Sequence, residues 1–193
     1  GSGIMAENLT SDNAIRLLAN TIATGAGLFV LITAFANISG AHLNPFVSLS
    51  MYLTKRIKGK ELLTFIPAQI LGCLLGVMLA NVFFEHSIIE LSTKNRDGFH
   101  IFLSEIVATF GLIFIIFATL KDGKTTVAAC VATYISAGYW FTSSTSFANP
   151  AVAIARTFTD SFTGINYLNT PTYIFAELLG AIVAIYIIKR LIK

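Results

Sequence analysis

The sequence predicts an all-α membrane protein whose single domain, residues 1–193, is made of two inverted repeats. Three observations predict this fold. Only 12% of the 193 residues are charged and 55% are hydrophobic, whereas about a quarter of a soluble domain is charged. Several apolar runs approach the roughly 20 residues that a helix needs to cross a bilayer. Finally, Asn44-Pro45-Phe46 and Asn149-Pro150-Ala151 stand in matching places of the two halves.

Five spans and two short helices are expected along the chain. The apolar spans cover about 13–37, 62–84, 101–120, 125–141 and 172–188. The segments 45–52 and 150–158 are too short to cross a bilayer and are expected as half-helices. Residues 85–100 are polar and are expected to form an exposed loop.

Each Asn-Pro pair predicts a helix start, because Asn is favoured as the N-cap and Pro at the first helical position. One pair alone would indicate no more than that. Two pairs at matching places predict half-helices that begin inside the membrane, with their positive dipole ends directed to its centre. Irregular backbone at that depth is tolerated where it lines water or is packed in protein. The loops therefore predict a pore for small neutral molecules, with the side-chain amides of Asn44 and Asn149 facing the lumen.

Further matches indicate an internal duplication. A shift of 105 aligns Thr21-Ile22-Ala23 with Thr126-Val127-Ala128, and a shift of 108 aligns Ala68-Gln69 with Ala176-Glu177. The first repeat is expected in residues 1–90 and the second in 101–193, each reading span, half-helix, span. The second repeat has an additional span, over 101–120, whose counterpart would precede residue 1. We therefore expect that this chain lacks its natural first transmembrane helix.

The basic residues predict the orientation, since cytoplasmic loops carry an excess of Lys and Arg. Alternating the spans across a cell (inner or plasma) membrane leaves Arg16, Lys94, Arg96 and Arg156 outside. The other side, predicted to be cytoplasmic and to hold the C-terminus, receives Lys55, Arg56, Lys58, Lys60, Lys121, Lys124, Lys189, Arg190 and Lys193. An odd number of spans separates matching elements, so the repeats are inverted, as in many permeation proteins.

At these residues the chain resembles the aquaporin, or major intrinsic protein, family. Ser39-Gly40-Ala41-His42-Leu43-Asn44-Pro45 is similar to the family's first signature, with Phe46 in place of the usual Ala, and Ser146 to Ala151 is similar to the second. The resemblance covers essentially the whole chain and implies six spans plus two half-helices in the complete protein, in a tetramer with one pore per chain. It also implies that Glu105 braces loop backbone; a proton relay is the alternative for an intramembrane carboxyl.

One departure from the family pattern narrows the expected function. The family normally has Arg directly after the second Asn-Pro-Ala, where this chain has Val152. The run from Asn149 to Arg156 is similar to a bacterial aquaglyceroporin branch associated with arsenic-resistance genes. The implied solutes are glycerol-like molecules, water, and arsenous acid or methylated arsenicals.

The resemblance also implies the residues of the permeation path. The selectivity constriction is expected at Thr24, Ala137, Ser146 and Val152, with Gly138 as an alternative to Ala137. Tyr139 and Trp140 are expected as interface anchors, although either could fold inward and narrow the path. His42 is expected in the inner vestibule or in a structural hydrogen bond. Arg156 is expected at the outer mouth, or held by Asp160 four residues on.

Other functions find less support in the sequence. No nucleophile, base and orienting group fall together, so an enzyme is not expected. Cys73 and Cys130 have no partner at metal-ligand spacing, and neither a metal nor a cofactor is expected. The net charge of +3 requires no nucleic acid, because the basic residues flank apolar runs. A secondary transporter and a non-functional channel fragment remain alternatives, since inverted repeats also serve transporters.

Overall fold

The computed structural model describes residues 1–191, and all regular structure in that range is helical. In chain order the elements are α1 (Ser2–Leu9), α2 (Asn13–Phe35), α3 (Pro45–Leu53), α4 (Gly59–Phe83), α5 (Phe99–Thr119), η1 (Leu120–Asp122), α6 (Lys124–Phe141), α7 (Pro150–Ala155), η2 (Arg156–Phe158) and α8 (Thr170–Leu191). The predicted all-α membrane fold is confirmed.

Four helices of the described range are long and apolar enough to cross a membrane, namely Asn13–Phe35, Gly59–Phe83, Phe99–Asp122 and Thr170–Leu191. The fifth expected span, α6, has 18 residues and is less apolar. Two of its hydroxyl groups are satisfied within the helix: Thr133 Oγ1 donates to Ala129 O and Ser136 Oγ to Ala132 O. A hydroxyl bonded to the preceding turn exposes no free donor, so α6 remains compatible with a membrane interior.

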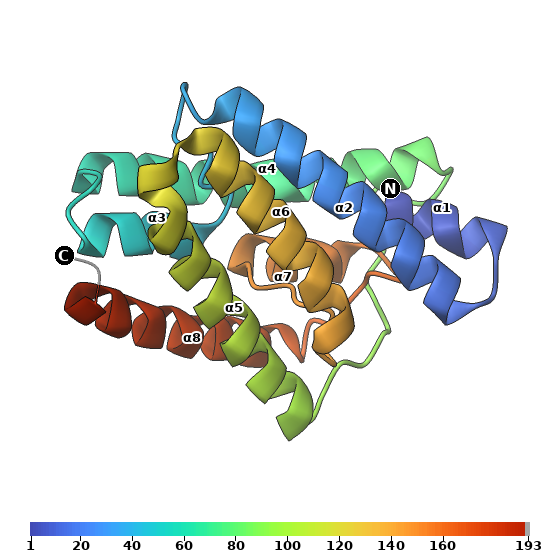
Figure 1. The fold of residues 1–193 in the computed structure, drawn as a ribbon. Helices are drawn as coiled ribbons and strands as arrows, with labels where there is room; N and C mark the ends of the chain where they lie inside the picture. Colours follow the sequence, from blue (N-terminus) through green and yellow to red (C-terminus); the bar gives the residue numbers. More distant parts are fainter. Residues whose placement is uncertain (192–193) are drawn as a thin grey trace.

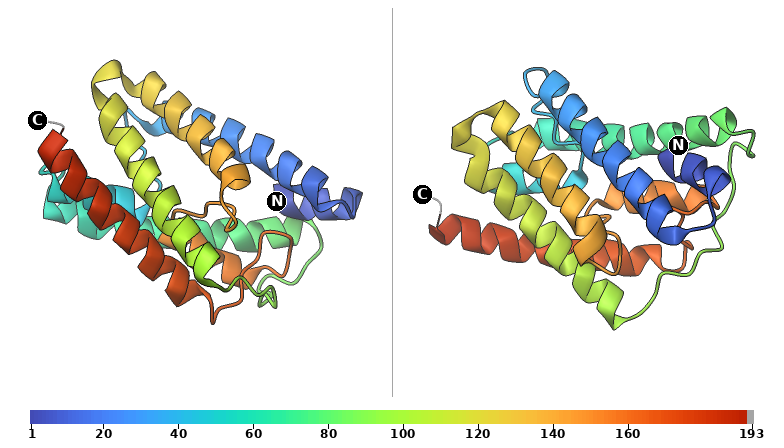
Figure 2. Two further views of the ribbon diagram at one scale, coloured as in Figure 1. Left: turned by 60° about the horizontal axis from the view of Figure 1, so that its bottom comes forward. Right: turned by 45° about the vertical axis from the view of Figure 1, so that its right-hand side comes forward.

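The half-helices α3 and α7 meet in the middle of the bundle (Figures 1 and 2). The longer helices pack around them in pairs, α2 against α6 and α5 against α8. The half-helix contacts are reciprocal. α3 packs against α4 and α8, and α7 packs against α8 and α4, as expected for two related units exchanged by a pseudo-twofold axis.

Close approach of backbones holds α5 and α8 together. A Cβ atom added at Gly180 would lie 2.4 Å from Ile106 O and 3.0 Å from Phe110 N, so only glycine fits there. Small residues at a helix contact allow this approach in membrane proteins. Around this contact Ala108, Ile113 and Ala181 are buried in the apolar core.

One end of the bundle gathers basic side chains. Lys55 and Arg56, just beyond α3, and Lys189, in the last turn of α8, line a common hollow with Phe117 of α5. Lys124, at the α5–α6 turn, donates to Asn37 Oδ1 just beyond α2 at 2.6 Å. Lys193, which the sequence assigns to the same group, lies outside the described residues.

The N-terminal helix α1 packs along α2. Ser2 Oγ donates to Asn20 Oδ1 at 2.9 Å, and Glu7 Oε2 accepts from Phe162 N at 2.7 Å. α1 therefore connects the start of α2 to the loop that follows α7.

Candidate permeation pathway

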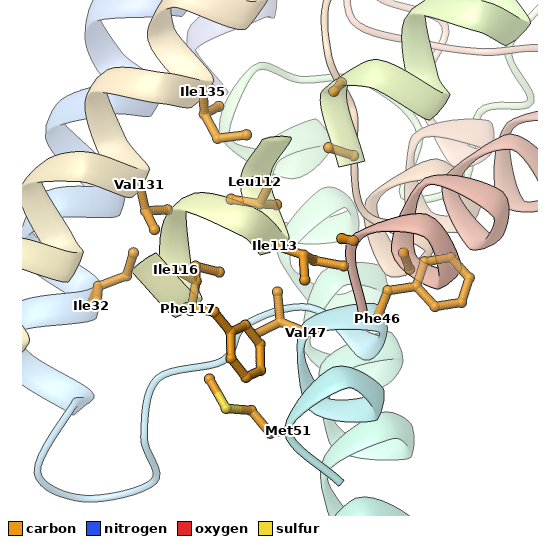
Figure 3. Packing of buried hydrophobic residues seen from close by; sticks show 14 of the residues in the cluster. Ile32, Phe46, Val47, Met51, Leu112, Ile113, Ile116, Phe117, Val131 and Ile135 are labelled. Carbon is orange, nitrogen blue, oxygen red and sulfur yellow. The ribbon is translucent and has the colours of Figure 1, made fainter. Parts of the chain in front are cut away.

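A cavity of about 170 Å³ lies where the half-helices meet the long helices. One wall is apolar, and Figure 3 shows many of its side chains converging from four helices. This wall contains Leu28, Ile32, Val47, Met51, Leu112, Ile116, Leu120, Val127, Val131 and Ile135. The other wall is formed by the two loops that lead into the half-helices, residues 40–44 and 145–149, which we call the corners; residues 40–44 and 146–149 line the cavity. The cavity is thus amphipathic, with backbone polar groups opposite hydrocarbon.

The two Asn side chains tie the corners together. Asn44 Nδ2 donates to Ala148 O at 2.6 Å, and Asn149 Nδ2 donates to Leu43 O at 2.9 Å. Each side-chain oxygen caps its own helix, accepting from Phe46 N at 2.9 Å and from Ala151 N at 3.1 Å. Both residues line the cavity, so the expectation that their amides face the lumen stays a prediction, and the structure adds that one hydrogen of each NH2 group is used across the corners. The second hydrogen of each group makes no hydrogen bond among the described residues.

The backbone of both corners is left-handed at matching positions. φ is +80° at Gly40 and +64° at Thr145, +48° at Ala41 and +49° at Ser146, and +51° at Leu43 and +48° at Ala148. Only the first of these residues is glycine, and left-handed φ is uncommon for other residue types. This conformation repeats with the same 105-residue shift as the Asn-Pro pairs, and nothing in the sequence at Leu43 or Ala148 predicted it.

Two buried carboxyl groups hold the second corner. Glu105 accepts from Phe147 N at 2.9 Å and from Ala148 N at 2.8 Å. Glu177 Oε1 accepts from Asn149 N at 2.9 Å, while its Oε2 has no hydrogen-bond partner among the described residues. Three consecutive amide groups are therefore satisfied by side chains from α5 and α8. Sequence reasoning had noted Glu177 but had given it no role.

Beside the first corner, the residue that matches Glu177 is Gln69, which shares a hydrogen-bonded group with His42 and Ser48. His42 lines the cavity, and its Nδ1 lies 3.0 Å from Ser48 Oγ. Gln69 Nε2, on α4, donates to the same Ser48 oxygen at 2.9 Å. The imidazole also packs edge-on against Phe65, with ring centroids 5.5 Å apart. Both expectations for His42 are thus compatible with its position, since it is at the cavity and hydrogen-bonded.

Three of the four expected constriction residues line the cavity: Thr24, Ser146 and Val152. Ala137 is exposed and does not line the cavity. Gly138 also does not line the cavity. It packs against Ser146, whose Oγ would lie 2.6 Å from an added Cβ atom. The residue that α6 supplies instead is Tyr139, which is buried and lines the cavity, with its hydroxyl 3.2 Å from Thr24 Oγ1.

Tyr139 therefore brings an aromatic side chain to the cavity, as in the alternative that it folds inward, while the composition of the constriction stays a prediction. Trp140 is 52% exposed and lies outside the cavity.

Arg156 lines the same cavity, but Asp160 does not hold it. Asp160 accepts from Thr93 N at 2.9 Å and from the Thr93 and Ser92 hydroxyls. The i,i+4 geometry fails because α7 ends at Ala155 and a 3-10 turn follows. The Arg156 guanidinium instead packs on the Phe147 ring, with Cζ 4.3 Å from the centroid, and Nη2 lies 3.4 Å from the Tyr139 hydroxyl.

Comparison with known proteins assigns the family. The major intrinsic protein family profile matches residues 1–144. The chain is 47% identical over its whole length to aquaglyceroporin AqpS of Rhizobium meliloti (strain 1021), and it covers 83% of that protein. The chain belongs to the major intrinsic protein family.

More distant family members are also similar to this chain. Aquaporin-4 of Bos taurus is 28% identical over 83% of this chain and 52% of its own length. Aquaporin TIP1-2 of Musa acuminata is 36% identical over 64% of this chain and 51% of its own length. Membership implies a multi-pass membrane channel for water and small solutes, and the similarity to AqpS supports the aquaglyceroporin branch.

Sequence reasoning missed several residues of the path. Tyr139 was expected at the interface, because aromatic residues often end a span there, and folding inward was only the alternative. Phe147 lies inside the second signature but was given no role, although it lines the cavity. Ser48 has no motif of its own, yet a position four residues after the Asn N-cap lies in the first turn of α3, close to the corner.

Proposed function

We propose that this family member is a passive channel whose constriction admits glycerol-sized uncharged solutes as well as water. The observation that carries the proposal is that Val152 lines the cavity, at the position after the second Asn-Pro-Ala where the family normally has Arg. A valine adds no charge and no hydrogen-bond donors, and it is shorter than an arginine. The path between Val152 and Thr24 is therefore expected to be wider and less polar than a water-only filter.

The amphipathic cavity supports this solute class. A polyol has hydroxyl groups along a short carbon skeleton, and it needs donors and acceptors on one side and hydrocarbon on the other. The Asn44 and Asn149 amides with the corner carbonyls supply the polar side, and residues such as Ile32 and Val131 supply the other. Exchanging water hydrogen bonds for these groups is the usual basis of selectivity in such pores.

The charge arrangement supports neutral rather than cationic solutes. Both half-helices direct positive dipole ends at the cavity, and Arg156 adds a positive charge at its edge. Proton coupling receives no support from Glu105, because both of its oxygens accept backbone N–H groups. This favours a channel over a secondary transporter.

We further propose four finer properties. The neutral hydroxide and methylated forms of trivalent arsenic resemble polyols in size and hydroxyl pattern, and they are candidate solutes. The active assembly is a homotetramer in the cell membrane, with lipid around its outer surface. The C-terminus is cytoplasmic, because the basic residues gather at that end of the bundle. Residues 1–90 and 101–193 are the two repeats.

Solute flux into proteoliposomes tests the central proposal. Glycerol uptake is expected to rise linearly with concentration and to be unaffected by proton or sodium gradients. Arsenous acid uptake is measured in parallel at neutral pH, where the molecule is uncharged. Uptake that saturates at modest concentration or follows an ion gradient would establish a transporter. Water flux without glycerol flux would show that the path is a water-only filter.

A further inference from the structure

Phe147, two residues before the second Asn, has two guanidinium groups on its ring. The Cζ atoms of Arg156 and Arg96 lie 4.3 and 5.3 Å from its centroid. We propose that Arg96, in the loop between α4 and α5, is a positioning residue for the outer constriction. By clamping Phe147 it keeps the Arg156 guanidinium on that ring and out of the solute path. The proposal rests on the proposed function, because it concerns the same constriction.

Phe147 lies between Arg96 and Arg156, so a change at Arg96 can shift Arg156 through the ring. It is buried and lines the cavity, and its backbone N–H is held by Glu105. Its ring also packs against Tyr173, with centroids 5.0 Å apart. The backbone is thus fixed at one point, while the ring depends on its neighbours for orientation. Arg96 is the neighbour that comes from a distant loop.

Arg96 is itself held rigidly. Its Nε donates to Gly164 O at 2.8 Å, its Nη2 donates to Phe162 O at 3.0 Å, and its backbone N donates to Asn169 Oδ1 at 3.0 Å. Two carbonyl groups of one loop therefore fix the guanidinium plane, and a planar fork loses little freedom for each bond it makes. Burial lowers the pKa of Arg96, but a guanidinium stays protonated in proteins. The ring thus faces a fixed positive charge.

Arg156 depends on the ring more than on any other partner in the described residues. Its hydrogen bond to the Tyr139 hydroxyl is long, at 3.4 Å, whereas its 4.3 Å distance to the ring centroid is well within the range of a cation–π contact. A mobile Phe147 would release a long, charged side chain beside the space that Val152 leaves open. The released guanidinium would obstruct glycerol more than water, because the larger solute needs the full opening.

Lys94 provides a matched control in the same loop. Its Nζ donates to Phe162 O at 3.1 Å and lies 5.0 Å from the Phe162 ring centroid. Lys94 therefore fastens the same loop with the same kind of contact, but to Phe162 rather than Phe147. If Arg96 only fastened the loop, removing either cation would have the same effect.

The first test measures the ratio of glycerol to water flux in proteoliposomes. Arg96→Lys keeps the charge but loses the planar fork, and we expect the ratio to fall about two- to fivefold, the range of one cation–π contact. Lys94→Gln is expected to leave the ratio unchanged. In an Arg156→Ala background, Arg96→Lys should no longer change it. Equal effects of Arg96→Lys and Lys94→Gln, or an Arg96→Lys effect that persists without Arg156, would overturn the proposal.

A second test does not depend on transport. With 4-fluorophenylalanine incorporated at position 147, the ¹⁹F chemical shift and linewidth report the ring directly. Arg96→Lys is expected to change both, and Lys94→Gln is expected to change neither. An unchanged ¹⁹F signal in Arg96→Lys would show that Arg96 does not clamp the ring. If the wild type passed no glycerol, the proposed function would fail, while the ¹⁹F result would still decide the clamp.

Phe147→Leu keeps the test decisive if Arg96→Lys does not fold. It removes the ring while keeping an apolar side chain, and it should lower the glycerol-to-water ratio as Arg96→Lys does. A Phe147→Leu protein that folds and keeps the wild-type ratio would refute the role of the ring.

Discussion

Replacing Glu105 with glutamine separates the two roles that the sequence left open for this carboxyl. Both of its oxygens accept buried backbone N–H groups, from Phe147 and Ala148, at 2.9 and 2.8 Å. A glutamine has only one acceptor oxygen, and in either amide orientation its NH2 group faces one of these N–H donors. One charge-assisted hydrogen bond is therefore lost.

The expected cost follows from this count. A hydrogen bond to a charged group contributes about 1.5–3 kcal/mol, and a buried unpaired donor costs a similar amount. These figures describe the same loss, so we expect Glu105→Gln to destabilise the fold by about 2–3 kcal/mol. For a chain of this size, this lowers the thermal midpoint by roughly 4–12 °C.

Glu177→Gln is the matched control. Glu177 accepts one N–H through Oε1, and its Oε2 has no partner among the described residues. A glutamine keeps the acceptor, and its NH2 group meets no backbone donor but can donate to the neighbouring Glu105 carboxyl, so the midpoint should not fall. Midpoints for both variants and the wild type in detergent micelles, with glycerol flux in liposomes, complete the comparison. Loop bracing would be refuted, and a relay supported, if the Glu105→Gln protein were as stable as the wild type and had acquired or lost proton-dependent flux.

Three further predictions concern the constriction. Val152→Arg should narrow the opening and add a charge. Glycerol and arsenical uptake should therefore fall at least about tenfold, the effect of about 1.4 kcal/mol, and water flux should fall less. Unchanged uptake in folded protein would place Val152 off the path. Tyr139→Ala should raise the flux of five-carbon polyols above that of the wild type, whereas Ala137→Val should leave polyol flux unchanged, and the reverse result would restore Ala137 to the filter. Arg156→Ala should raise proton or sodium leak without lowering glycerol flux, and an unchanged leak would remove Arg156 from the ion barrier.

Local chemistry explains why much of the fold was predictable. An Asn N-cap followed by Pro at the first helical position fixes a helix start within a few residues of sequence. α3 and α7 accordingly begin at Pro45 and Pro150, as predicted. The spans followed from apolar runs of membrane length. The boundaries of the two repeats and the tetramer remain predictions.

The side-chain register of α6 was less predictable. Consecutive residues on a helix point about 100° apart, so a two-residue error turns a side chain from the cavity to the outside. Amphipathic periodicity normally fixes this register, but α6 has small residues on several faces. Ala137 and Tyr139 both fit the local pattern, and only packing against Thr24 of α2 selects Tyr139.

Contacts between distant segments had no local signal at all. The Asn44 and Asn149 amides reach carbonyl groups 104 and 106 residues away, and Arg96 reaches Phe147 from another loop. The expected pairing of Arg156 with Asp160 assumed that the helix continues past Arg156. In the structure α7 ends one residue earlier, at Ala155. Because the helix stops there, the guanidinium can turn back to the Phe147 ring beside Tyr139. The guanidinium therefore lies on the Phe147 ring beside the cavity, one turn beyond the position where the family normally has its arginine, and the constriction at Val152 stays a prediction.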